Sequence, residues 1–196
     1  MASLPPSLTT ELQAVNVMLS VIGEAPVNQL EGANISDVAT ARNILAEVSK
    51  EVQSKGWDFN TEDNYPLVPD VDGNICLPAN IARVAVDITS YPDHDFVQRG
   101  LRLYDKKQHT YEVPHTVEAK IVLILDFEEM PEPFRRYVTI KASRIFQDRT
   151  VGSDTLHGFS AKDEAVAYVA MVDADADSDD ATIFDAAHMQ VMIRRR

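Results

Sequence analysis

The apolar residues of the first sixty positions predict two helices separated by a turn. Most positions between residues 11 and 22 are apolar, and the polar ones form one narrow strip at helical spacing: Gln13, Asn16 and Ser20. A helix with so thin a polar strip must be covered on more than one side. The residues expected in the core of the subunit itself are Leu12, Val15, Leu19 and Ile22. We expect Val17 or Val21 to be covered by a neighbouring subunit.

The first helix is expected over 9–22 and the second over 36–55. Gly23 and Pro26 end the first, because glycine accepts the left-handed conformation and proline prevents the helix from resuming. Ser36 is a suitable N-cap for the second helix. Its apolar stripe consists of Val38, Ala41, Leu45, Val48 and Val52, and Gly56 ends it.

Residues 57–127 carry the pattern of β-structure. Short segments rich in β-branched and aromatic residues alternate with turn signals, chiefly Asp72-Gly73 and Arg99-Gly100. About six strands are expected from seven extended segments, which are 65–69, 74–78, 81–89, 96–97, 101–104, 110–113 and 117–127. Five prolines in this region confine such strands to edges and ends. The pattern predicts a small antiparallel sheet or sandwich and not a parallel α/β core.

Helical spacing returns at Pro131, with helices expected over 133–150 and 161–176. The predicted fold class is α+β, a four-helix bundle-like layer with an inserted antiparallel β-rich lobe. The expected parts are a helical pair (1–56), the lobe (57–130), a second helical pair that completes the bundle (131–176), and an acidic linker with a C-terminal tail (177–196).

Several short motifs resemble one family when they are taken together. In order they are Ala14-Val15-Asn16, Ile22-Gly23-Glu24, Pro26-Val27, Ala41-Arg42, Gly56-Trp57-Asp58-Phe59-Asn60, Arg99-Gly100-Leu101-Arg102-Leu103-Tyr104-Asp105, Phe127-Glu128-Glu129-Met130-Pro131-Glu132 and Ala142-Ser143-Arg144-Ile145-Phe146. Their order and spacing, over roughly residues 11–150, resemble tail tubular protein A of short-tailed bacteriophages.

This resemblance implies a structural subunit of the virion tail that is assembled in the cytoplasm of the bacterial host. The family forms a dodecameric adaptor ring below the portal protein and above the tail nozzle (tail tubular protein B), with tail fibres attached near its lower edge. DNA leaves through the centre of the ring without specific binding. The implied partners are the portal, the nozzle, the tail fibre and further copies of the chain, and no membrane is involved.

The charge and composition of the chain restrict its partners. A net charge of −13 argues against tight nucleic-acid binding, which needs lysine and arginine to neutralise phosphates. Such a charge suits a wall that DNA passes without adhering, or it serves solubility alone. The N-terminus lacks a secretion signal, and no apolar run reaches the length of a membrane span. The single cysteine, Cys76, is expected to be buried in a strand.

The densest carboxylate cluster consists of Asp126, Glu128, Glu129 and Glu132. Two carboxylates at a suitable separation perform glycoside hydrolysis, so Glu128 and Glu132 are weak catalytic candidates for a tail-associated polysaccharide or peptidoglycan hydrolase. This hydrolase is the alternative function, and it is compatible with being a second activity of the same protein. The other interpretation is that these carboxylates stabilise the N-terminus of the helix that follows.

No pattern in the sequence indicates a cofactor or a metal. The five histidines show no metal-ligand spacing, and no glycine motif for nucleotide binding is present. The acidic stretch from Asp173 to Asp180 begins like an EF-hand loop, but Ser178 and Phe184 occupy the positions that need glycine and glutamate. A solvated linker or a frayed helix end explains the stretch better.

Further interface candidates come from isolated features. Trp57, the only tryptophan, is either a core residue or an interface anchor. Arg135 and Arg136 are expected opposite the apolar stripe of the third helix, facing either a neighbour's acids or water. The C-terminal tail carries Phe184 and ends in Arg194, Arg195 and Arg196, which suit an acidic partner surface.

Overall fold

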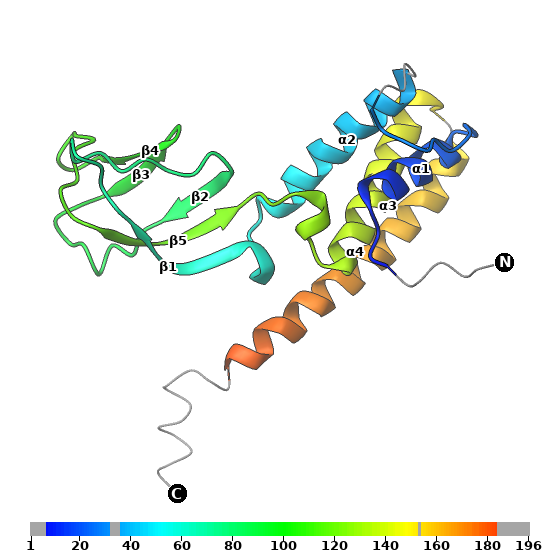
Figure 1. Cartoon of the computed structure of the whole chain (residues 1–196). Coiled ribbons are helices and arrows are strands. Elements are labelled where there is room, and N and C mark those ends of the chain that lie inside the picture. Colours follow the sequence, from blue (N-terminus) through cyan, green and yellow to red (C-terminus); the bar gives the residue numbers. More distant parts are fainter. Residues whose placement is uncertain (1–6, 32–35, 153, 184–196) are drawn as a thin grey trace, which may run out of the picture. The chain divides into compact units, whose positions relative to one another are not determined.

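A computed structural model describes residues 7–31, 36–152 and 154–183, apart from the side chains of 154–160 and 179–183. In this part of the chain the α+β prediction is confirmed. Four helices pack together, and small antiparallel sheets are inserted between the second and the third helix (Figure 1). The chain divides into two compact units: a helical unit, Met1–Val52 and Asp126–Arg196, and a β lobe, Gln53–Leu125.

The helices of the helical unit are α1 (Glu11–Val21), α2 (Ser36–Gln53), α3 (Glu132–Thr150) and α4 (Asp154–Ile183). The first three lie close to their predicted ranges. Helix α4 begins at Asp154 and not near Ala161, so it continues through Gly158 despite the low helix propensity of glycine. The acidic stretch 173–180, expected as a linker or a frayed end, belongs to this helix.

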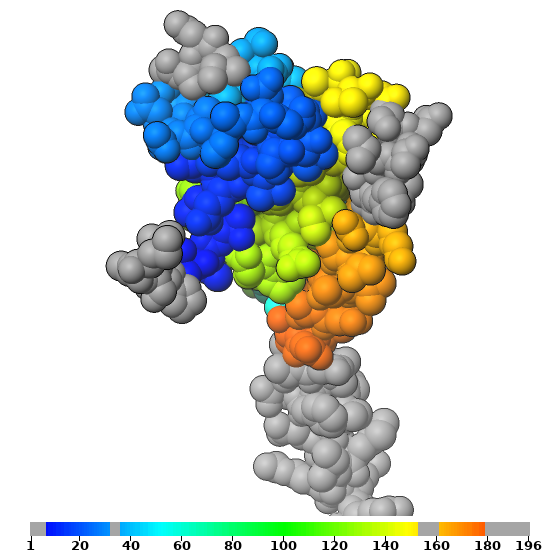
Figure 2. All heavy atoms as spheres, turned by 90° about the vertical axis from the view of Figure 1, so that its right-hand side faces the viewer, coloured from blue at the N-terminus to red at the C-terminus, as the bar shows by residue number. Residues whose placement is uncertain are grey.

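Helix α3 is the centre of the helical unit. It contacts both α1 and α4, and it lies between them (Figure 2). Its buried residues occupy most of its circumference: Phe134, Arg135, Tyr137, Val138, Thr139, Ala142, Ser143, Phe146 and Gln147. Because α3 is covered on so many sides, the other elements of this unit pack around it.

Helix α1 and the segment after it are fixed by side chains of the polar strip. Thr10 Oγ1 accepts a hydrogen bond from Gln13 N (3.2 Å), while Gln13 Oε1 accepts one from Thr10 N (3.0 Å), which forms a capping box. Asn16 donates to Val27 O (3.0 Å) and accepts from Val27 N (2.8 Å). These two bonds attach the segment after α1 to the helix. They explain why Asn16, one of the three residues of the polar strip, lies in this largely apolar helix.

The β lobe contains two antiparallel sheets. The strands β1 (Thr61–Leu67), β5 (Val117–Leu123) and β2 (Ile81–Ala85) form one sheet in the order β1-β5-β2. The strands β3 (Phe96–Arg99) and β4 (Arg102–Asp105) form a hairpin. Its loop begins with Gly100 at φ +59°, as a type II′ turn requires, so the predicted reversal is confirmed.

Two of the predicted strands are absent from the described lobe. Segments 74–78 and 110–113 make only isolated bridges, such as Asn74 with Glu112 and Cys76 with Arg102. The expected burial of Cys76 is wrong, since its side chain is exposed. Ile75 and Leu77 point into the lobe core instead, and the alternation of an extended chain turns the residue between them outward.

The backbone at Gly56 lies close to two side chains of the β lobe, so a substitution at this position tests the packing of the lobe. Its φ is +80°, and a Cβ there would lie 2.9 Å from Val122 Cγ2 and 2.8 Å from Arg83 Nη2. We expect Gly56→Ala to lower the free energy of unfolding by about 2–4 kcal/mol, the sum of a left-handed conformation and overpacking. Gly73→Ala is the matched control, because φ is +77° and nothing lies within 4 Å of its added Cβ. Equal losses in urea unfolding of the two variants would contradict this account.

Candidate interaction surfaces

Arg135 is not on the surface, so its expected position opposite the apolar stripe is wrong. Its side chain is 4% exposed, and the guanidinium donates to three backbone carbonyls. The acceptors are Met130 O (2.6 Å), Thr9 O (2.8 Å) and Glu128 O. The fork of guanidinium donors suits such multiple acceptors. Arg135 therefore joins the start of α1 to the turn before α3, and it is not available to a partner.

The two catalytic candidates also hold the N-terminal segment. Glu132 accepts hydrogen bonds from Thr9 N (2.8 Å) and Thr9 Oγ1 (2.5 Å), and Glu128 accepts one from Glu11 N (3.4 Å). Their carboxylates lie at the beginning of α1 and α3, where the helix dipole favours negative charge. The contacts in the structure match the helix-terminus interpretation, and hydrolysis at these residues stays a prediction.

The remaining described candidates differ in exposure. Arg136 is exposed on α3, and it lies one helical turn after Glu132, on the side where that residue holds the start of α1. Val17 is 46% exposed and Val21 is half-buried, while Val15 and Leu19 are buried as predicted. Leu12 and Ile22 are only half-buried.

Trp57 is half-buried in the lobe. Its backbone N–H donates to Asn60 Oδ1 (2.9 Å), and Asn60 is itself buried. Its role as an interface anchor stays a prediction. The candidates Phe184, Arg194, Arg195 and Arg196 lie outside the described residues.

Among its described side chains, helix α4 exposes most of the apolar ones. The side chains that it buries in the helical unit are Ala167 and Met171. Val169 has the helical spacing of a core residue but is 57% exposed, and Tyr168 is 38% exposed although its ring lies 5.4 Å from that of Tyr137 on α3. We call the exposed face around Val169 the α4 stripe; it consists of Ala161, Ala165, Val169, Val172 and Ala176, of which Val172 alone is half-buried. Apolar residues on more than one side of α4 are the sequence signal for this surface.

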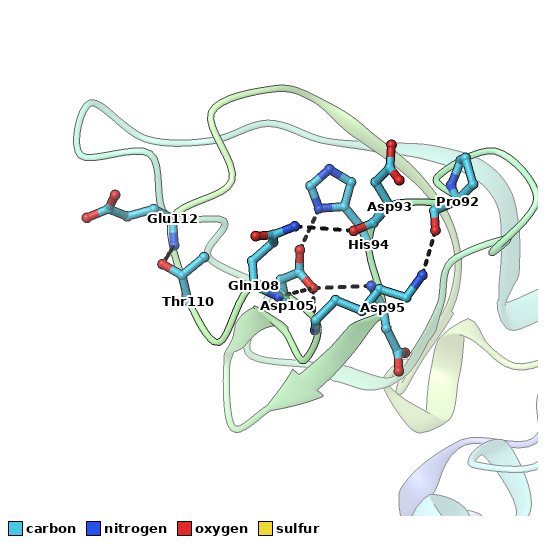
Figure 3. Close-up of polar contacts among 9 residues, drawn as sticks. Pro92, Asp93, His94, Asp95, Asp105, Gln108, Thr110 and Glu112 are labelled. Atoms are coloured by element: carbon cyan, nitrogen blue, oxygen red, sulfur yellow. Dashed lines mark hydrogen bonds and ion pairs between the residues drawn. The ribbon is translucent and has the colours of Figure 1, made fainter.

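The lobe contains a polar cluster that sequence spacing did not indicate. Asp105 ends β4 and is 1% exposed, and Figure 3 shows its carboxylate between the backbone of Asp95 and the ring of His94. One oxygen accepts from the N–H groups of Asp95 (3.2 Å), Lys107 (2.8 Å) and Gln108 (3.3 Å). The other lies 2.5 Å from His94 Nδ1.

These contacts determine the ionisation of Asp105. Burial of its carboxylate raises the pKa, but the hydrogen bonds from His94 and from three backbone N–H groups outweigh that effect, and the pKa is lowered from 3.8 to about 2. The ring of His94 also stacks on Phe96, with centroids 5.0 Å apart, and lies 5.4 Å from His115. The cluster fixes the loop between β4 and residue 110 against the segment before β3.

A metal site and a membrane-crossing helix have no counterpart in the described part of the chain. His94 and His115 come together, but no group of three or more histidine, cysteine or acidic side chains there is arranged to hold a metal ion. Among the same residues, no helix combines the length and the apolar character that a membrane crossing requires.

Comparison with known proteins gives one consistent result. The family model described as "Tube: Tail tubular protein" matches residues 12–181. "Tail tubular protein A" of Klebsiella phage KP34 is 32% identical to this chain over 162 residues, which cover 83% of this chain and 84% of that protein. The match includes both the helical unit and the β lobe.

Proposed function

Because this chain belongs to the tail tubular protein A family and is a structural component of the virion tail, we propose that it forms the adaptor ring between the portal and the tail nozzle. The observation that carries the proposal is the family match, which spans both units of the chain. The ring is dodecameric, as the family resemblance implies, and the tail fibre attaches near its lower edge.

The distribution of charge supports a role along the path of DNA. The chain has a net charge of −13, and the exposed aspartates of α4 include Asp163, Asp173 and Asp177. A negative wall repels phosphates, so DNA passes through the ring without adhering to it. Specific DNA binding forms no part of this function.

The exposed apolar residues support self-association. A single subunit leaves Val17 on α1 and the α4 stripe uncovered, although apolar side chains at these positions add nothing to solubility. In a ring, each subunit presents two lateral surfaces to its neighbours, which gives such residues a partner.

Val17→Asp tests this role of α1. Because Val17 is already 46% exposed, we expect the free energy of unfolding to change by less than about 0.5 kcal/mol. Burial of the new carboxylate between subunits should weaken ring assembly by about tenfold or more. Thermal melting and sedimentation velocity measure the two effects separately. A parallel loss of both would mean that Val17 belongs to the core of the subunit.

The adaptor role itself is tested by bridging. The cognate portal protein, carrying an affinity tag, is produced together with the nozzle protein, with and without this chain. We expect the nozzle to be recovered on the tagged portal only when this chain is present. Recovery of equal amounts of nozzle in its absence would contradict the proposed adaptor function.

A further inference from the structure

The helical unit exposes apolar side chains on two flanks, on α4 and around α1, both of which contact α3. On one flank is the α4 stripe, about four helical turns long. On the other, α1 exposes Val17 (46%) and the segment before it exposes Leu8 (54%). Helix α3 separates the two, with α1 and α4 on its opposite sides (Figure 2).

The attachment of α4 explains why its stripe stays uncovered. Arg144 of α3 forms an ion pair with Glu164, and the rings of Tyr137 and Tyr168 lie 5.4 Å apart. Ala167 and Met171 are buried on the same side of α4, so this side faces the rest of the helical unit. The stripe lies on an adjoining side of the helix, where Val169 is 57% exposed.

The charges beside the two surfaces are complementary. Asp173 is exposed and follows Val169 by four residues, so it borders the α4 stripe. Arg136 is exposed on α3, four residues after Glu132, whose carboxylate holds the start of α1 on the other flank. An acid beside one apolar surface and a cation near the other are complementary across a contact between two copies.

From these features we infer that the α4 stripe of one copy packs against the α1 flank of the next copy, around Leu8 and Val17, with Asp173 facing Arg136. The contact is heterologous, because each copy contributes a different surface to each of its two neighbours, and such contacts close into rings. The inference rests on the proposed ring function and specifies which surfaces form it.

Engineered disulfides test this arrangement in the full-length chain. The native thiol is first removed by Cys76→Ser, and Val17→Cys and Val169→Cys are then combined. Under mild oxidation at high protein concentration, the double variant should give a ladder of covalent oligomers, since each copy is linked to two neighbours. Each single variant should give little covalent product. Efficient dimerisation of the Val169→Cys protein alone would show that α4 packs on α4, and this result or the absence of any ladder would overturn the inference.

Charge reversal provides an independent measurement. Arg136→Asp and Asp173→Arg should each weaken self-association by about tenfold in sedimentation equilibrium, and the two together should restore most of it. Additive losses in the combined variant would contradict the pairing of these residues. A chain that bridges portal and nozzle but fails both tests would retain the proposed function and lose only this interface.

Discussion

Arg135→Met is expected to lower the free energy of unfolding of the helical unit by about 2–4 kcal/mol. Methionine fills most of the space but has no donors, so the carbonyls of Met130, Thr9 and Glu128 lose their buried partner. Because Arg135 is 4% exposed, water cannot replace the guanidinium without rearrangement of the N-terminal segment. Urea unfolding followed by circular dichroism measures this loss.

The neighbouring arginine is the matched control for this substitution. Arg136→Met changes the same side chain one position along the same helix, but Arg136 is exposed. We expect it to change the free energy of unfolding by less than about 0.5 kcal/mol. If both variants unfold at the same urea concentration, the role given to Arg135 in joining α1 to α3 is wrong.

Asp105→Asn is expected to destabilise the β lobe by about 2–4 kcal/mol. One carboxylate oxygen accepts from three backbone N–H groups and the other is hydrogen-bonded to His94, and a neutral amide loses the negative charge that strengthens these bonds. Asp95→Asn is the control, because the ion pair of Asp95 with Lys106 is exposed and contributes less than about 1 kcal/mol. Similar losses from the two substitutions would contradict the role of the buried carboxylate.

The pKa of Asp105 predicts how the stability of the lobe depends on pH. The pKa of Asp105 is lowered from 3.8 in the unfolded chain to about 2 in the fold. Its ionised form therefore stabilises the lobe fully above about pH 4, and this contribution is lost as the pH falls towards 2. The difference in melting temperature between wild type and Asp105→Asn should shrink over that interval. A constant difference would mean that Asp105 does not carry this effect.

The helices could be predicted from the sequence because their signals are local. Ser36 and Pro131 indicate where helices begin, and Gly23 and Gly56 where they end, from the backbone geometry that each residue allows. The strand pairings were harder to predict. Strand β5 pairs with both β1 and β2, which lie far from it in sequence, and segments 74–78 and 110–113 have strand composition without a continuous partner.

The sites were predicted less well than the fold. Helical spacing predicts which residues share one face of a helix, but not what covers that face. Arg135 lies at a position that spacing placed on a polar face, yet the N-terminal segment covers it and offers a carbonyl acceptor. Val169 has core spacing and is 57% exposed, since the side of α4 that is buried carries Ala167 and Met171, while Tyr168 lies between the two sides with its ring against Tyr137 of α3. Asp105 meets His94 only because β3 and β4 pair, and no local motif records that pairing.

The most direct test of the adaptor function is the mass of the complex formed with the cognate portal protein. The purified chain, the portal alone and their mixture are measured by analytical ultracentrifugation. We expect the mixture to contain a species heavier than the portal by several copies of this chain, consistent with a ring seated on it. Separate sedimentation of the portal and the chain, at concentrations where both remain folded, would contradict the adaptor function.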